Sequence, residues 1–388
     1  MDFRISEEQR AFVETVRKLC QKDFKARAIR YLDGTWPAEN MKSLADIGVL
    51  GMAVPREYGG SGLGILDTVL VLEEIGKVCY VTAMAALGEL GVQTRVIAAY
   101  APESIKQRVL PRVASGEAIL AICMTEPDAG TDVPNYTTNS DIRGDRVIVN
   151  GVKTLISRAD IAEMLVVFTR VNKVPGAKGI GCVLVPGGAQ GMTVKSSFHT
   201  MGGEYLSEVV FENVELPLEN LVLRDDGIKR LLSAFNTQRC LNPAICLGLA
   251  EGALEEAVRY MRDRSAFGRK IGEFQGLRWK AADMYTEIEA ARGLLYRAAV
   301  SGDRFPDPVL AAMAKIYCNE MSIRVTSEAI QVHGGYGFTD EFAVSRYFRG
   351  TRYGSLGGGT TETLRNLVAK RLVEQMDLAT GVAGMGTY

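Results

Sequence analysis

Histidine and cysteine, which often bind metals or act as nucleophiles, offer little chemistry in this sequence. His199 and His333 are the two histidines, too few for a multi-histidine metal site or a Ser-His-Asp arrangement. The seven cysteines are scattered with no Cys-x-x-Cys pair, a pattern that favours buried, reduced thiols. We therefore expect no metal site and no conventional histidine-activated nucleophile.

Charge and hydropathy exclude several classes of partner. Lys plus Arg number 45 and Asp plus Glu 46, which gives a net charge of -1 without long runs of one sign. Such a chain lacks both the basic surface that neutralises nucleic-acid phosphates and a polybasic membrane anchor. No apolar stretch approaches the ~20 residues that cross a bilayer, and the first residues lack the apolar region of a signal peptide. We predict a cytoplasmic protein with no nucleic-acid or membrane partner.

Three segments of different periodicity must position any site. Residues 1–117 have helical periodicity, beginning with a capping box at Ser6 and Gln9. Residues 118–225 have β periodicity, and residues 226–388 return to long amphipathic helices. We predict an α+β multidomain protein with an all-α N-terminal domain, a central antiparallel β domain and a C-terminal four-helix bundle.

The elements within these segments follow from apolar spacing and turn residues. Glycine makes up 41 of the 388 residues, above the usual ~7%, which predicts many turns. Helices are expected at 37–47, 66–78, 82–99, 102–113, 231–264, 274–299, 308–333 and 361–376. Strands are expected at 118–124, 146–156, 164–170, 180–186, 192–197 and 208–216, separated by turns such as Asn150-Gly151.

Several short motifs occur in order along these segments. They are MTEPDAGTD at 124–132, NGVKTLIS at 150–157, FENVELP at 211–217, RSAFG at 264–268 and QVHGGYGF at 331–338. Each alone is a weak signal, because a glycine loop or an Asn-Gly pair is usually just a turn. Together, in this order, they resemble the signatures of the acyl-CoA dehydrogenase family.

This resemblance implies an oxidoreductase that passes a hydride from an acyl-CoA thioester to N5 of FAD. In the family, FAD lies between the β domain and the C-terminal bundle. At the flavin it implies the backbone amides of Met124 and Thr125, the Thr125 hydroxyl, and Ser157 opposite N5. Leu155 replaces the tryptophan usual beside the ring, an aliphatic cover in place of an aromatic one.

The same resemblance assigns further residues to FAD and implies partners. Arg264 matches a pyrophosphate-binding arginine, whose guanidinium suits phosphate oxygens. A neighbouring subunit is expected to hold part of FAD, which implies a homotetramer or a heteromer with a homologous subunit. Electron-transfer flavoprotein is the expected electron acceptor. The other residues assigned to FAD are Thr131, Ile156, Phe267, Phe274, Gln275, Gln331, Gly334, Gly335, Thr360 and Glu362.

The positions of the family's catalytic base carry no carboxylate. In one branch of the family the glutamate that removes the α-proton would stand at Gly358, and in another at Gln238, before Arg239. Neither glycine nor a neutral amide accepts a proton usefully near neutral pH. Gln238, Arg239 and Gly358 are thus expected in the substrate pocket, where the Gly358 N–H can still polarise a thioester carbonyl.

Three hypotheses account for the missing base. First, another carboxylate acts: Glu89, in the otherwise apolar run 83–92, is the main candidate and Asp128 the second, although a solvated helix face and a turn are the more ordinary interpretations. Second, the chain performs a non-oxidative acyl-CoA reaction, as related desulfinases do with an arginine on the pocket helix that anchors an acidic substrate. The absence of arginine between Lys77 and Arg95 counts against this hypothesis and against a glutaryl-type substrate. Third, it is a non-catalytic FAD-binding partner subunit of a heteromeric dehydrogenase.

Overall fold

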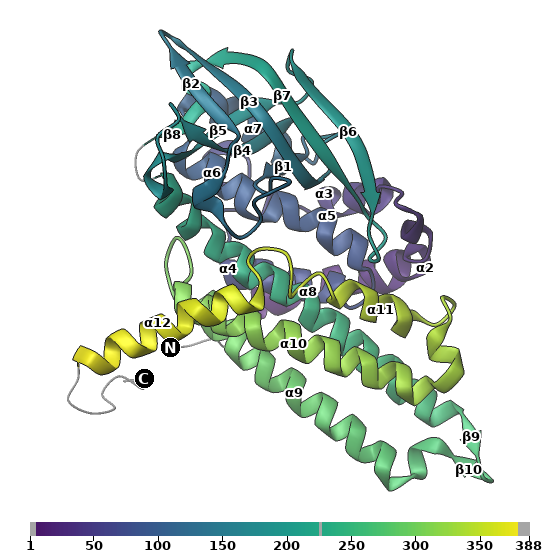
Figure 1. Ribbon diagram of the computed structural model, residues 1–388. Coiled ribbons are helices and arrows are strands. Elements are labelled where there is room, and N and C mark those ends of the chain that lie inside the picture. The colour runs from purple at the N-terminus through teal and green to yellow at the C-terminus, as the bar shows by residue number, and fades with distance from the viewer. Residues whose placement is uncertain (1–4, 225–226, 379–388) are drawn as a thin grey trace. The chain divides into compact units, whose positions relative to one another are not determined.

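The computed structural model describes residues 5–224 and 227–378 (Figure 1). The chain forms two compact units. The helical unit consists of Met1–Arg30, Ile65–Met84 and Asn236–Tyr388, and the sheet unit of Tyr31–Gly64 and Ala85–Phe235. The predicted domain boundary at 225–226 and the last ten residues of the predicted third domain lie outside the described residues.

The helices and strands follow one another in the order α, β, α. The helices before the sheet are α1 (Glu7–Leu19), α2 (Lys25–Arg27), α3 (Ala38–Asp46), α4 (Ile65–Gly76), α5 (Tyr80–Leu90), α6 (Val92–Tyr100) and α7 (Glu103–Ala114). The strands of the large sheet are β1 (Leu120–Cys123), β2 (Asn139–Arg143), β3 (Arg146–Ser157), β4 (Met164–Val171), β5 (Ile180–Pro186), β6 (Met192–His199), β7 (Tyr205–Pro217) and β8 (Leu221–Leu223). Then come α8 (Gly227–Asp263), the hairpin β9 (Ser265–Ala266) and β10 (Arg269–Lys270), α9 (Gln275–Ala299), α10 (Pro308–His333), α11 (Ala343–Thr351) and α12 (Thr361–Leu378).

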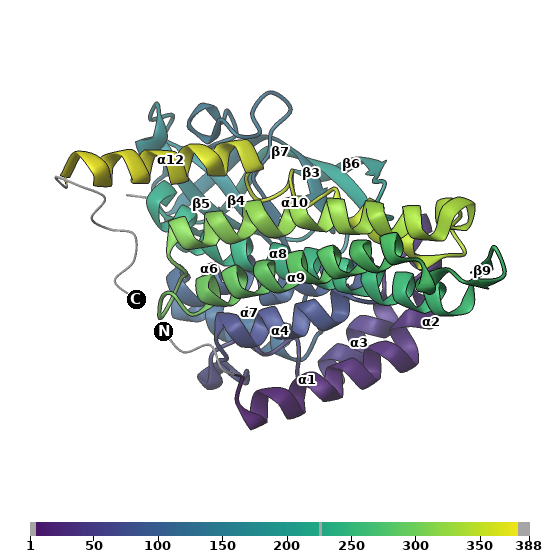
Figure 2. The same ribbon diagram turned by 90° about the horizontal axis from the view of Figure 1, so that it is seen from below.

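Long helices build the helical unit. Within it, α8, α9 and α10 run side by side, and α10 also contacts α11 and α12 (Figure 2). Helices α4 and α8 approach backbone to backbone at glycines: a Cβ added at Gly248 would lie 2.1 Å from Glu73 O, and one at Gly252 would lie 2.3 Å from Lys77 O. Glycine is therefore required at this crossing, because any side chain would force the two helices apart.

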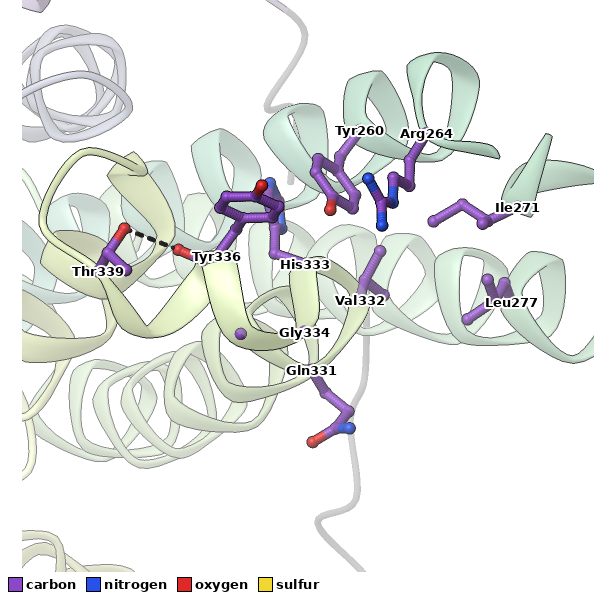
Figure 3. Close-up of a pocket in the computed structure, with 11 residues that line it drawn as sticks. Tyr260, Arg264, Ile271, Leu277, Gln331, Val332, His333, Gly334, Tyr336 and Thr339 are labelled. Atoms are coloured by element: carbon purple, nitrogen blue, oxygen red, sulfur yellow. Dashed lines mark hydrogen bonds between the residues drawn. The ribbon is translucent and has the colours of Figure 1, made fainter. Parts of the chain in front are cut away.

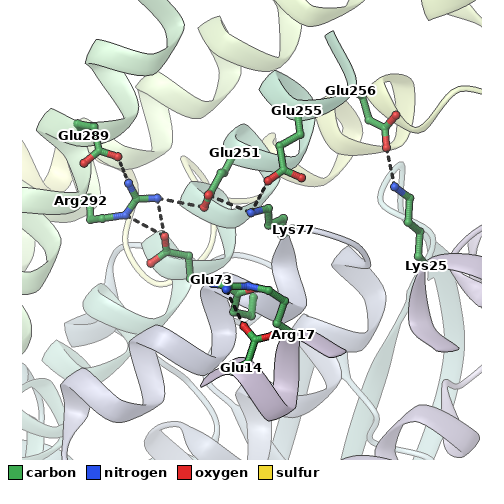
Figure 4. A network of polar contacts seen from close by, with 11 residues as sticks. Glu14, Arg17, Lys25, Glu73, Lys77, Glu251, Glu255, Glu256, Glu289 and Arg292 are labelled. Carbon is green, nitrogen blue, oxygen red and sulfur yellow. Dashed lines mark hydrogen bonds and ion pairs between the residues drawn. The ribbon is translucent and has the colours of Figure 1, made fainter. Parts of the chain in front are cut away.

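Ion pairs connect the same helices (Figure 4). Arg292 of α9 donates through Nε (3.0 Å) and Nη2 (2.7 Å) to Oε1 of Glu73 on α4, and through Nη2 to Glu251 of α8 at 3.0 Å. Lys77, just after α4, donates to the other oxygen of Glu251 at 2.9 Å. The buried charges of this network are thus neutralised by partners on neighbouring helices, as burial of charge demands.

The sheet unit is built around a mixed sheet of order β6-β7-β3-β2-β4-β5-β8, with β1 beside β4. Most neighbouring pairs are antiparallel, as predicted. The expectation of a purely antiparallel sheet is nevertheless wrong, because β4 pairs in parallel with both β1 and β2. Inward-facing valines such as Val147, Val149 and Val209 form the core on one face of this sheet.

One further expectation about a helix is corrected, and some elements were not predicted. The helix predicted over 82–99 is broken at Gly91 into α5 and α6, and the Thr94 hydroxyl donates to Glu89 O at the break. The apolar periodicity of the sequence continues through this break and therefore does not predict it. Helix α11 and strand β2 were not predicted. Within the described residues no helix is long and apolar enough to cross a membrane.

Candidate functional site

A buried ion pair fixes the segment after β1 in the sheet unit. Nζ of Lys153, on β3, donates to Met124 O (2.7 Å) and to Oε1 of Glu126 (2.9 Å). Glu126 also accepts the amides of Thr137 (2.6 Å) and Thr138 (3.0 Å). Burial lowers the pKa of Lys153 to about 8. Burial alone would raise the pKa of Glu126, but the charge and hydrogen bonds of Lys153 outweigh it and the pKa is lowered.

This ion pair was not predicted residue by residue, although both partners lie in the quoted motifs. Lys153 follows Val147 and Val149 at the inward positions of β3. A lysine at an inward position of a strand indicates a buried partner of opposite charge, so this position could have predicted the ion pair. The consequence is that Met124 and Thr125 belong to a rigid segment.

The end of β3 presents the residues assigned to the flavin ring. Thr154 N donates to Thr125 O at 2.8 Å, while the Thr125 hydroxyl has no hydrogen-bond partner within the described residues. A bulge between Lys153 and Ile156 puts Leu155 at φ 57° with 51% of its surface exposed. Ile156 is buried and Ser157, at the strand end, is partly buried. The bulge therefore turns Leu155 outward beside Ser157, a strained arrangement of the kind found at functional sites.

A pocket of about 610 Å³ in the helical unit brings together four residues predicted to bind FAD (Figure 3). They are Arg264, Gln331, Gly334 and Gly335. Arg264 is exposed and forms no ion pair within the described part of the chain. Gly334 has φ +61°, and a Cβ added at either glycine would meet nothing within 4 Å, so both face open space. An unpaired guanidinium beside an open glycine turn suits a phosphate-bearing ligand.

Aromatic rings make one wall of this pocket. The ring of His333 stacks on Tyr260 with centroids 4.5 Å apart, and its Nδ1 is 2.8 Å from Ala329 O. Burial lowers the pKa of His333, which favours the neutral ring. His333 therefore has a packing role in this wall, and catalysis by imidazole is not needed to explain it.

The other residues assigned to FAD in this unit lie at two places. Phe267 is 95% exposed at φ 53° in the β9–β10 hairpin, and its ring is edge-on to Phe274 at 6.2 Å. Gln275 begins α9. Thr360 caps α12 by accepting the Thr363 amide at 3.3 Å, and Glu362 is exposed in the first turn. Thr131, in the sheet unit, is also exposed.

Lysine and asparagine side chains hold the loop that contains Gly358. Lys315, fully buried in α10, donates to Gly354 O (2.7 Å) and Gly359 O (3.0 Å). Asn319, one turn later, donates to Gly354 O at 2.6 Å. Gly358 itself has φ +74°. Gly358, the position at which the family resemblance puts a base, is thus on a loop whose carbonyl groups are fixed from α10.

The other predicted base position lies on α8. Gln238 is partly buried, and the adjacent Arg239 donates from Nη1 to Asn236 Oδ1 at 2.8 Å. Nε of Arg239 is buried and has no hydrogen-bond partner among the residues that the structure describes. Burial lowers the pKa of Arg239.

Glu89 does not lie on a solvated helix face, and that interpretation is wrong. It is 1% exposed in the sheet unit, where Arg158 Nη1 contacts both carboxylate oxygens (3.2 and 3.1 Å) and the Leu120 amide donates to Oε1 at 3.1 Å. Burial raises its pKa, and the charge of Arg158 opposes this rise. These contacts favour a structural role for Glu89. Asp128 is exposed in the tight turn between Glu126 and Ala129, in keeping with a turn-forming aspartate.

Comparison with known proteins gives the family. The chain matches the models of the N-terminal (residues 6–117), middle (121–214) and C-terminal (225–373) domains of acyl-CoA dehydrogenase. It is 36% identical over 386 residues to 3-sulfinopropanoyl-CoA desulfinase of Advenella mimigardefordensis, covering 96% of this chain and 95% of that protein. It is 33% identical over 378 residues to the short-chain specific acyl-CoA dehydrogenase of Clostridium acetobutylicum, covering 96% and 100%.

Solved structures agree with these relatives. Butyryl-CoA dehydrogenase from Megasphaera elsdenii matches with a TM-score of 0.91 and 30% identity, over 96% of this chain and 100% of that one. The chain therefore belongs to the acyl-CoA dehydrogenase family. It is an acyl-CoA oxidoreductase of the acyl-CoA dehydrogenase type, in a family whose members are flavoproteins that use FAD.

Proposed function

We propose that this chain binds FAD and uses it to accept a hydride from an acyl-CoA thioester. The observation that carries the proposal is the pocket lined by Gln331, the open glycine turn and Arg264, which forms no ion pair within residues 5–224 and 227–378. When bound, FAD supplies the hydride acceptor. Arg264 would hold its pyrophosphate, and the rigid Met124–Thr125 segment would offer amides and a hydroxyl to the ring.

The remaining expectations about this enzyme are proposals of the same kind. We propose three domains at 1–117, 118–225 and 226–388, assembly with further copies of the chain or a homologous subunit, and electron-transfer flavoprotein as the acceptor. The net charge of -1 and the absence of a membrane-crossing helix among the described residues are compatible with a cytoplasmic enzyme.

A non-oxidative acyl-CoA reaction is the second candidate function. The observation that favours it is that both base positions, Gly358 and Gln238, lack a carboxylate, while Glu89 is held by Arg158. A relative with 36% identity is named as a desulfinase acting on 3-sulfinopropanoyl-CoA. In that case the chain would still bind FAD, but the acyl-CoA thioester would not reduce the flavin.

Spectroscopy of the purified protein tests these functions. We expect the purified or FAD-reconstituted protein to show flavin absorbance. We also expect this absorbance to bleach under anaerobic conditions when a panel of straight, branched and cyclic acyl-CoA thioesters includes the substrate.

Arg264→Ala should weaken FAD binding about ten-fold or more, and Arg264→Lys should weaken it less. Exposed Lys178→Ala, in the sheet unit, is the matched control. A protein that cannot take up FAD contradicts the proposal; FAD uptake with no bleaching by any thioester favours the non-oxidative candidate or a non-catalytic partner subunit.

A further inference from the structure

Lys153 places an ammonium group in the interior of the sheet unit, where three groups surround it. Nζ donates to Met124 O at 2.7 Å and to Oε1 of Glu126 at 2.9 Å, and it lies 4.0 Å from the centroid of the Tyr136 ring. The side chains of Lys153 and Glu126 are 0% and 3% exposed. Burial lowers the pKa of Lys153 to about 8 and the charge of Glu126 opposes this, so the group carries its charge at pH 7.

The contact with Met124 is not needed to neutralise this charge. Glu126 supplies one negative charge for the positive charge of Lys153. Glu126 also accepts the amides of Thr137 (2.6 Å) and Thr138 (3.0 Å) and the Thr137 hydroxyl (2.8 Å). Two opposite charges this close largely cancel at longer range. What the ammonium adds locally is a charged hydrogen bond on the Met124 carbonyl oxygen.

The Met124 carbonyl and the Thr125 amide belong to one peptide group. Because resonance links its oxygen and nitrogen, an ammonium at the oxygen draws electrons from the nitrogen and makes the N–H a stronger donor. This N–H donates to no acceptor within residues 5–224 and 227–378, whereas the next carbonyl, Thr125 O, accepts from Thr154 N at 2.8 Å. The protein thus fixes the carbonyl on each side of the strengthened donor and leaves the donor itself for a bound molecule.

We propose that Lys153 is a positioning residue for the flavin: through the peptide group of Met124 and Thr125 it strengthens the donor offered to the ring and so favours the reduced ring over the oxidised one. The inference rests on the proposed function, in which this segment serves the flavin. A reduced flavin carries more negative charge than an oxidised one, so a stronger donor stabilises the reduced form more. Lys153 thereby raises the reduction potential of bound FAD.

Three variants separate this role from that of an ordinary ion pair. Lys153→Met removes the positive charge, Glu126→Gln leaves the ammonium on Met124 O, and a double variant carries both substitutions. Removal of one partner leaves a buried charge unpaired, and the double variant avoids this. Each protein is reconstituted with saturating FAD, and its midpoint potential is measured by reductive titration against a reference dye. Lys178→Met, exposed in the sheet unit, is the matched control and should keep the potential of the unmodified protein.

We expect Lys153→Met and the double variant to lower the ratio of affinities for reduced and oxidised FAD about ten-fold, which is a fall of about 30 mV in potential. Glu126→Gln should not lower the potential, because the ammonium stays on Met124 O. A merely structural ion pair predicts that both single variants lower the potential alike, and that result overturns the inference.

The double variant decides the matter where a single variant fails to fold. If it has the potential of the unmodified protein, the two charges act only through space and cancel, and the inference is overturned. A double variant that takes up no FAD also overturns it, because a weakened donor alone should not abolish binding.

FAD uptake by the unmodified protein separates this inference from the proposed function. If the unmodified protein takes up FAD and only the expected differences between the variants fail, the proposed function stands and the role of Lys153 is wrong. If the unmodified protein takes up no FAD, the flavin site itself is wrong and both proposals fall.

Discussion

Glu89 is the residue at which a structural and a catalytic role make opposite predictions. Its carboxylate neutralises Arg158 in the interior of the sheet unit and also accepts the Leu120 amide. Glu89→Gln leaves the guanidinium without its counter-charge, so we expect a loss of about 3 kcal/mol in the free energy of unfolding. Flavin reduction by an accepted thioester should keep its rate. Urea denaturation and stopped-flow absorbance measure the two effects.

Asp128→Asn is the control for this substitution. Asp128 is exposed in a turn, so neither the unfolding free energy nor the rate should change by much. The reverse result for Glu89→Gln, a rate lowered more than a hundred-fold with stability unchanged, would identify Glu89 as the relocated base.

Lys315 predicts a pH dependence of stability. Burial is the main cause that lowers its pKa from 10.5 to about 8, with the charge of Arg239 acting in the same direction. Between these values the unfolded chain binds a proton that the folded chain has released, so the free energy of unfolding rises with pH through this window. The full rise from this residue is about 3 kcal/mol.

Lys315→Met tests this sign. The variant cannot titrate, so its unfolding free energy, measured by urea denaturation from pH 7.5 to 10.5, should rise less with pH than that of the unmodified protein. Lys178→Met, on the surface of the sheet unit, should follow the unmodified protein. Parallel curves for the Lys315 variant and the unmodified protein would show that burial does not shift this pKa.

At the scale of elements, α4 and α8 depend on glycine for their close approach. Gly248→Ala puts a Cβ within 2.1 Å of the backbone oxygen of Glu73, which cannot move without shifting α4. We expect a loss of about 2 kcal/mol or more in the free energy of unfolding. Gly293→Ala, within α9 and with nothing within 4 Å of the added Cβ, should instead stabilise by about 0.5–1 kcal/mol. Thermal unfolding of both variants checks the prediction, and equal effects would contradict the close crossing.

Local signals explain which elements the sequence could predict. Helix α10 spans the predicted 308–333, because Asp307 caps a long apolar period and Gly334 ends it. The capping box of Ser6 and Gln9 is likewise confirmed at α1. The parallel pairing of β4 was not predictable, since register between distant strands leaves no local pattern.

The same distinction applies to the candidate site. The motif residues Arg264, Gln331, Gly334 and Gly335 meet in one pocket of the helical unit. The clamp of Lys315 and Asn319 on the Gly354–Gly359 loop was missed, because their contacts span 35 to 44 residues and a lysine in a helix usually lies on its surface. The interpretation of Glu89 as part of a solvated helix face was wrong for the same reason, because its partner Arg158 lies 69 residues away in the sequence.

The whole molecule exposes large apolar side chains that suggest assembly. Trp279 and Tyr285 on α9 are 61% and 59% exposed, and Leu372 and Val373 on α12 are 47% and 57% exposed. Phe267, assigned to FAD, is 95% exposed in the β9–β10 hairpin. Large aromatic side chains are enriched at interfaces between subunits relative to the rest of the surface. We predict that further copies of the chain cover it and that the protein sediments as a tetramer, at about four times the chain mass of 42.2 kDa.

Trp279→Glu tests the assembly and its connection to FAD together. A carboxylate buried in an apolar interface is strongly unfavourable, so sedimentation velocity should show species smaller than the tetramer. Because the family resemblance assigns part of each FAD to a neighbouring subunit, the smaller species should also lose flavin absorbance in the same run. Lys178→Glu introduces a carboxylate on the exposed surface of the sheet unit and should change neither quantity. Loss of assembly with full retention of FAD would show that one chain holds the cofactor alone, whereas an unmodified protein that sediments at 42.2 kDa would contradict the interface itself.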